Sequence, residues 1–247
     1  MAFIRPFAFA ASAILALANP ATAQESAWSY SGTFYLWAAE TKTSIDTRVG
    51  TIESTLSFGD ALENLDFAFM GTLQAQKGPW SIIGDFVGTN LSFSQPTPGG
   101  RFGGLDSSIK TQAFNAYALR EVRSSENWTL DAGAGVRWFN AESTLTLLPG
   151  SNQGGSASID DSWFDPLLAA RLRYAISDRW TGTAFIDVGG FRSGSQSFQA
   201  ILTATYTIND NWSFVGGYRY LGLRHGTEND EFKFSQSGPL VGVGYKF

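Results

Sequence analysis

A short polar turn followed directly by tryptophan occurs four times in this chain, and it constrains the fold more than any other feature of the sequence. The tryptophans are Trp80, Trp128, Trp180 and Trp212. After each of them, apolar residues recur at every second position, as in Phe214, Gly216, Tyr218 and Tyr220. A period of two is typical of β-strands, because successive side chains point to opposite faces. The repeat therefore predicts four strands, each beginning immediately after a tight turn.

The positions between these apolar residues carry charges, and the segments that enter the turns alternate in the same way. A soluble β-sandwich with this pattern would have to bury the charges or expose the apolar face, and both are costly. We therefore expect the apolar face to contact lipid and the polar face to line an enclosed interior. The predicted interior charges are Asp85, Arg120, Asp131, Arg137, Asp165, Arg171, Arg173, Asp187 and Arg219.

An opening strand at residues 27–37 and a closing strand at residues 231–247 bring the predicted total to about ten, with eight or twelve as alternatives. In lipid, strands satisfy all their backbone groups only in a closed sheet. The predicted fold class is thus all-β, a closed antiparallel transmembrane up-and-down β-barrel. Residues 43–58 could add a hairpin above the membrane, and residues 59–65 are the one plausible helix.

The connections between strands alternate in length. The four turns that carry tryptophan are short, whereas residues 39–65, 94–107, 141–161 and 225–230 form longer connections; residues 193–196 are a short exception. Short periplasmic turns and longer extracellular loops are the outer-membrane pattern. Trp80, Trp128, Trp180 and Trp212 are therefore predicted to form a periplasmic aromatic girdle at the level of the lipid headgroups.

Both ends of the chain carry export signals. Arg5, an apolar run over residues 7–18 and the small residues Ala21-Thr22-Ala23 predict a cleaved secretory signal peptide at residues 1–23, used by the Sec pathway. The chain has no cysteine, which excludes a lipid-anchored lipoprotein. Residues 24–247 are then one outer-membrane barrel domain. Its last strand ends on Val241, Val243, Tyr245 and Phe247, which resemble the C-terminal signal read by the barrel-assembly machinery.

Net charge and composition limit the classes of partner that we expect for this chain. Without the signal the chain has 16 basic and 22 acidic residues, a net charge of −6, which argues against nucleic acid. No cofactor or metal is expected, since the acidic loops lack calcium-loop spacing. The expected partners are outer-membrane lipid and lipopolysaccharide, with periplasmic chaperones and the assembly machinery during biogenesis. We expect a monomer.

Six stretches of the mature chain carry a resemblance to known proteins: residues 58–71, 163–166, 178–180, 187–191, 217–221 and 238–239. They resemble a family of outer-membrane β-barrel proteins from Gram-negative, especially alphaproteobacterial, genomes, which is loosely similar to the small OmpA-type barrels. The resemblance covers nearly all of the mature chain and implies an outer-membrane location and a barrel fold, but it brings no catalytic residues.

The interior charges allow two functional interpretations. An excess of arginine in an open lumen would favour anions and make the protein a narrow porin-like channel for small hydrophilic solutes. Alternatively, paired charges fill a narrow barrel and hold it shut. We favour the second, a structural or surface barrel with a charge-plugged interior that is not an enzyme. A further alternative is a hydrolase at the outer rim, where His225, the sole histidine, follows a predicted strand.

Overall fold

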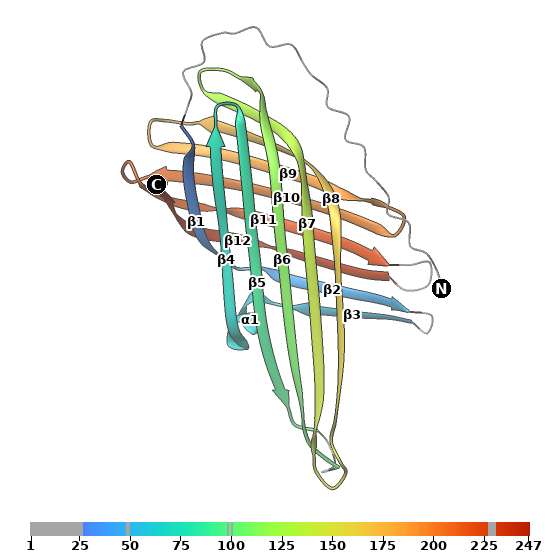
Figure 1. The fold of residues 1–247 in the computed structure, drawn as a ribbon. Helices are drawn as coiled ribbons and strands as arrows, with labels where there is room; N and C mark the ends of the chain where they lie inside the picture. The colour runs from blue at the N-terminus through green and yellow to red at the C-terminus, as the bar shows by residue number, and fades with distance from the viewer. Residues whose placement is uncertain (1–26, 48–49, 98, 100, 227–230) are drawn as a thin grey trace, which may run out of the picture.

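The computed structural model describes residues 27–47, 50–97, 99, 101–226 and 231–247. The predicted signal peptide and its cleavage site lie outside these residues. The described chain is an antiparallel sheet of twelve strands, ten of which close into a barrel (Figure 1). β1 (Ser29–Trp37) completes the barrel, because it pairs with β4 (Leu65–Lys77) on one side and with β12 (Glu231–Lys246) on the other. The predicted fold class is confirmed.

From β4 to β12, nine strands follow one another around the barrel, each paired with its neighbours in sequence. Consecutive antiparallel strands joined by tight turns are the simplest up-and-down arrangement. After β4 they are β5 (Trp80–Gln95), β6 (Phe102–Ser124), β7 (Trp128–Pro149), β8 (Gly155–Ala175), β9 (Trp180–Arg192), β10 (Ser195–Thr207), β11 (Trp212–Gly226) and β12.

The segment between β1 and β4 extends the sheet beyond the barrel. β2 (Glu40–Thr47) and β3 (Gly50–Leu56) form a hairpin, and β2 pairs with residues 231–237 of β12. This is the extra hairpin considered for residues 43–58. A helix, α1 (Phe58–Glu63), follows and is capped by the Ser57 hydroxyl, which accepts a hydrogen bond from the amide of Asp60. Among the described residues, no helix has both the length and the apolar character needed to cross a membrane.

The prediction of long loops at residues 94–107 and 141–161 is wrong, because most of these residues belong to strands. The ladder between β6 and β7 continues to the pair Phe102 and Pro149, and that between β7 and β8 continues to Leu147 and Gly155. The period of two persists in Ser-Thr-Leu-Thr-Leu at residues 143–147, so pairing does not stop at the membrane surface. In Figure 1, β5–β8 form one long arm, and β9–β12 with β2 and β3 form another that leans away from it.

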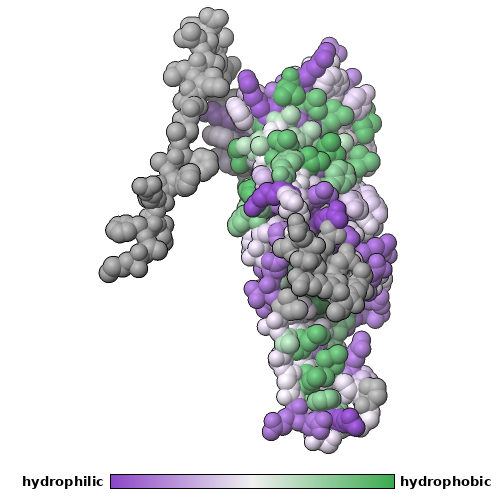
Figure 2. All heavy atoms as spheres, turned by 90° about the vertical axis from the view of Figure 1, so that its right-hand side faces the viewer, coloured by the Kyte–Doolittle hydropathy of each residue, from purple (hydrophilic) through white to green (hydrophobic). Residues whose placement is uncertain are grey.

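The outer surface of the barrel carries an apolar belt. Leu73, Leu168, Leu202 and Phe214 are each more than half exposed, as expected for side chains that contact lipid rather than a protein core. Figure 2 shows hydrophobic residues gathered in a band on the upper part of the molecule in that view, the part opposite the tip of the long arm. The belt follows the predicted alternation on seven strands: β4, β5, β7, β8, β9, β10 and β11.

The four tryptophans begin β5, β7, β9 and β11, so they lie together at the end of the barrel with the short turns. Trp180 packs against Tyr206 with ring centroids 5.0 Å apart, and Trp212 against Tyr245 at 4.7 Å. Tyr245 belongs to β12, where Val241 is exposed, and the exposed Phe247 follows the strand. The tryptophans thus share one end of the barrel, and their role as a periplasmic aromatic girdle stays a prediction.

Arg120 is a correction to the predicted interior. In β6, Ala113, Tyr117 and Leu119 are buried, whereas Arg120 is exposed and its guanidinium lies 5.8 Å from the ring centre of Trp80. The alternation misled the prediction because β6 has apolar or small residues on both faces, and the apolar set was assigned to lipid. At the strand end, Arg120 can keep its charge at the headgroup level while its stem covers apolar surface.

Candidate functional site: the polar interior of the barrel

The interior of the barrel is filled by polar and apolar layers that alternate along its axis. Two groups of charged residues are separated by an apolar layer that includes Ile83, Leu119 and Phe185. A second apolar layer, with Phe139, Trp163 and Phe234, lies toward the end of the barrel away from the short turns. We call the larger charged group, which lies between these layers, the central network, and the smaller one, nearer the short turns, the turn-side cluster.

One half of the central network surrounds Arg219 on β11. Its guanidinium donates to Asp85 at 2.8 Å, to the hydroxyl of Tyr35 at 2.6 Å and to the Gln199 side-chain oxygen at 2.6 and 3.0 Å. Asp85 also accepts hydrogen bonds from Tyr35 at 2.6 Å and from Thr72 at 3.0 Å. The carboxylate is thus neutralised by one arginine and oriented by two hydroxyls.

The other half surrounds Arg137 on β7. This guanidinium lies 2.9 Å from the Asp187 carboxylate, and it also donates to Asn115 at 2.6 Å and to Ser197. Asp187 accepts further hydrogen bonds from Tyr117 and from Gln199, both at 2.7 Å.

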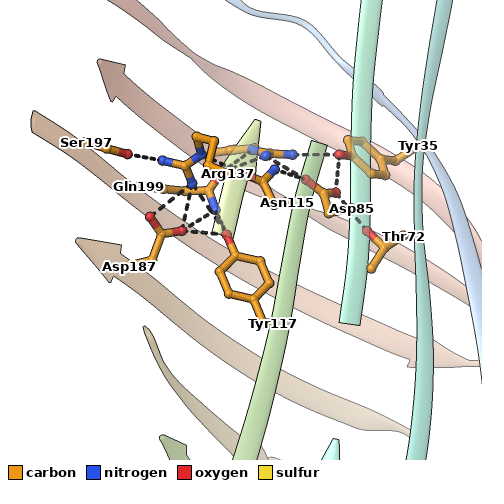
Figure 3. Close-up of polar contacts among 10 residues, drawn as sticks. Tyr35, Thr72, Asp85, Asn115, Tyr117, Arg137, Asp187, Ser197 and Gln199 are labelled. Carbon is orange, nitrogen blue, oxygen red and sulfur yellow. Dashed lines mark hydrogen bonds and ion pairs between the residues drawn. The ribbon is translucent and has the colours of Figure 1, made fainter. Parts of the chain in front are cut away.

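Two amide side chains join the halves (Figure 3). Gln199 accepts from Arg219 and donates to Asp187, whereas Asn115 accepts from Arg137 and donates to Asp85 at 3.0 Å. An amide can do both because it carries an acceptor and two donors. The central network is therefore one connected set of hydrogen bonds across the lumen, with residues from eight of the ten barrel strands.

The turn-side cluster is built around Asp131. Arg171 donates to this carboxylate at 2.8 Å, and Arg173 lies 3.4 Å from it. Arg171 also reaches across the lumen to the Gln74 side chain at 2.8 Å and to the Ser81 hydroxyl at 2.9 Å. Arg173 is the less enclosed of the two, since 28% of its side chain is exposed.

Asp165 lies apart from both groups, in the apolar layer that contains Trp163. It accepts hydrogen bonds from the indole of Trp163 at 3.0 Å and from the hydroxyl of Ser195 at 2.6 Å. The His225 ring stacks on the indole of Trp163, with ring centroids 4.3 Å apart. Its Nδ1 is buried and has no hydrogen-bond partner among the described residues.

Every predicted interior charge other than Arg120 thus lies inside the barrel. The arginines of the central network are 0 and 1% exposed, and its two aspartates are 7 and 1% exposed. Because each arginine faces a carboxylate, the lumen does not present a row of free cations. The excess of arginine inferred from sequence disappears once Arg120 is placed outside: four arginines remain with four aspartates.

Several residues of the central network were not predicted as interior charges or site residues. Tyr35, Asn115, Tyr117 and Gln199 are uncharged, and Tyr117 was assigned to the lipid face with its apolar neighbours. A sequence signal exists for Gln199, which alternates with the apolar residues of its strand. Tyr35 and Tyr117 carry no such signal, because an aromatic side chain is found both on lipid-facing surfaces and in protein cores.

No protein-family model matches the chain, and no curated protein matches its sequence. Among solved structures, the outer membrane protease OmpT from Escherichia coli matches with a TM-score of 0.57 and 11% sequence identity, covering 89% of this chain and 97% of OmpT. The chain therefore has the closed β-barrel fold seen in this outer-membrane protein. Weaker matches to this barrel are Ail of Yersinia pestis (TM-score 0.36, 10% identity, 91% and 100% covered) and the toluene transporter TodX of Pseudomonas putida (0.35, 10%, 93% and 92%).

Proposed function

We propose that this protein is a closed structural barrel of the Gram-negative outer membrane, with its interior plugged by charges and its arms presented to the outside. Export through the Sec pathway, assembly by the barrel machinery and a monomeric state belong to the same proposal. So does membership of the alphaproteobacterial-type barrel family that the sequence resembles.

The burial of Arg137, Asp187 and Arg219 at 0–1% exposure carries this proposal. These side chains lie at the centre of the lumen, where a water-filled channel would leave them solvated. The apolar layers on either side of the central network add further barriers to water and ions. A small barrel filled by its own side chains is a packed core rather than a pore.

The experiment that tests the proposal is solute uptake by liposomes containing the refolded mature protein. Arabinose and chloride should enter no faster than into empty liposomes, whereas a general porin in parallel liposomes should admit both. A folded sample is recognised by its heat-modifiable gel mobility. Uptake above the empty-liposome rate by folded protein would favour the alternative, a narrow porin-like channel.

A further inference from the structure

The long arm carries an exposed strand edge. β8 pairs with β7 from Gly155 to Tyr174, but its pairing with β9 begins only at Leu167. Residues 155–166 therefore have a strand on one side and, among the described residues, none on the other. In Figure 1 this part of β8 runs along one border of the long arm. We call residues 155–162 of β8 the free edge.

The direction of the backbone groups on the free edge follows from hydrogen bonds elsewhere in β8. Successive residues of an antiparallel strand direct their N–H and C=O groups to alternate sides. The amide of Ala175 donates to the carbonyl of Asn127, next to β7, at 2.7 Å. The carbonyl of Phe164 accepts from Arg192 of β9 at 2.7 Å, on the opposite side. Because the β7–β8 ladder runs without a register shift, the even-numbered residues present their backbone groups to the open side. On the free edge these residues are Ser156, Ser158, Asp160 and Ser162.

The free edge lacks the features that usually protect an edge strand. Natural β-sheets prevent edge-to-edge pairing with proline, lysine and bulges. Residues 155–162 contain neither proline nor lysine, and no bulge interrupts their ladder with β7. The side chains of Ser156, Ser158 and Ser162 are exposed and small, so they leave room for a further strand.

The charges beside the free edge indicate the chemistry of a strand that would pair with it. Asp160 lies directly opposite Glu142 of β7, which lies opposite Lys110 of β6. Asp160 and Glu142 are exposed, and neither forms an ion pair with another described residue. Like charges directly across an antiparallel pair are destabilising. A basic residue on an added strand, opposite Asp160, would offset this repulsion and complete a row of two anions between two cations.

We propose that the free edge binds a basic extended peptide of another protein as an additional strand, with a lysine or arginine opposite Asp160. Backbone hydrogen bonds to β8 supply affinity, and the acidic side chains select basic sequences. A second copy of this chain is a poorer partner through the same edge, because residues 155–166 contain no basic residue. The inference rests on the proposed outer-membrane location, which places the long arm outside the lipid, and it leaves the interior closed.

Binding of a fluorescent peptide to the refolded mature protein in nonionic detergent, followed by fluorescence anisotropy, tests the proposal. The probe alternates lysine with threonine over the length of the free edge. The protein should bind this peptide, and it should bind neither a peptide with glutamate in place of lysine nor one in which every backbone amide is methylated. The methylated peptide keeps its charges but cannot donate backbone hydrogen bonds. Equal binding of the lysine peptide and its methylated form would overturn the proposal, because charge alone would then explain the binding.

Variants of β8 locate the bound peptide. S158P removes an amide that points to the open side, so the β7–β8 ladder is kept while the free edge loses a donor. S158P should keep folded gel mobility and lose binding of the lysine peptide. D160N should weaken binding about two- to fivefold, because one cross-strand charge pair is lost. The matched control D210N removes an exposed acid from the short turn between β10 and β11 and should bind as the wild type does.

Three results would overturn the proposal. Unchanged binding by folded S158P would place the peptide elsewhere, such as on the edge of β3, and unchanged binding by D160N would remove the basis for a basic partner. A wild-type dimer in size-exclusion chromatography that S158P converts to a monomer would show that a second copy occupies the free edge. Solute uptake by liposomes is measured separately, so a failure of peptide binding is distinct from a failure of the closed-barrel proposal.

Discussion

Arg137 and Arg219 are fully enclosed in a barrel whose outer surface is an apolar belt, so their charges have no access to bulk water. Each is stabilised by a carboxylate and by hydroxyl or amide oxygens from other strands. A buried ion pair is not strongly stabilising overall, because desolvation offsets the attraction between the charges. Removing one partner is costly, however, because the other charge is left buried alone.

The first prediction follows from this asymmetry. R137A should lower the free energy of unfolding by about 3–5 kcal/mol, because Asp187 loses its buried counter-charge. The measurement is the urea midpoint of unfolding in lipid vesicles, followed by gel mobility. The exposed Arg179, whose guanidinium reaches only Tyr206 among the described residues, gives the control R179Q, which should shift the midpoint little. A double variant R137M/D187L should recover part of the loss; equal stability of R137A and R179Q would contradict the network's role.

The second prediction concerns the close approach of β6 and β7. A Cβ added at Gly133 would stand 2.0 Å from the carbonyl oxygen of Ala118, whereas one added at Gly216 would meet nothing within 4 Å. G133A should therefore destabilise the barrel by about 1–3 kcal/mol, since the strands must separate, and G216A should be nearly neutral. The urea midpoints of unfolding of G133A and G216A test this prediction. An unchanged midpoint for G133A would contradict it and show that β6 and β7 can separate without loss of stability.

Among single residues, the sequence located the buried aspartates because an acid between two apolar neighbours on a strand can only face the interior. It failed at Arg120, since neighbours on both faces are apolar or small and the phase of the alternation is then undetermined. The pairing of Arg137 with Asp187 and of Arg219 with Asp85 could not be predicted. Those partners lie 50 and 134 residues apart and meet only across the lumen.

At the scale of elements, the tight turns and their tryptophans correctly predicted where β5, β7, β9 and β11 begin. The strand ends away from the tryptophan turns were less predictable. Gly, Ser and Asp in residues 94–107 and 141–161 are typical of loops. Strand pairing that is already established in the barrel nevertheless continues into these segments, because extending a formed hairpin costs little additional entropy.

The third prediction addresses the β2–β3 hairpin. Because β1 pairs directly with both β4 and β12, the barrel closes without β2 and β3. Replacing residues 40–56 with a short Gly-Ser linker should give a protein that still refolds to the heat-modifiable form. Failure to refold would mean that the hairpin is needed to set the register of β12.

For the whole molecule, the alternation of apolar and polar residues specified a closed barrel, since only closure satisfies both faces and the backbone in lipid. The state of the lumen was not specified in the same way. A row of charges is compatible with an open or a filled interior, and the filled state depends on uncharged residues such as Tyr35 and Gln199 that connect the ion pairs.

The most direct test of the filled interior is single-channel recording of the refolded mature protein in planar bilayers, on samples with folded gel mobility. We predict no reproducible conductance steps, because the buried side chains of the central network and of the two apolar layers lie across the lumen. Ion-selective steps from the wild-type protein that change in R171A or R219A would contradict the account and show that the interior conducts.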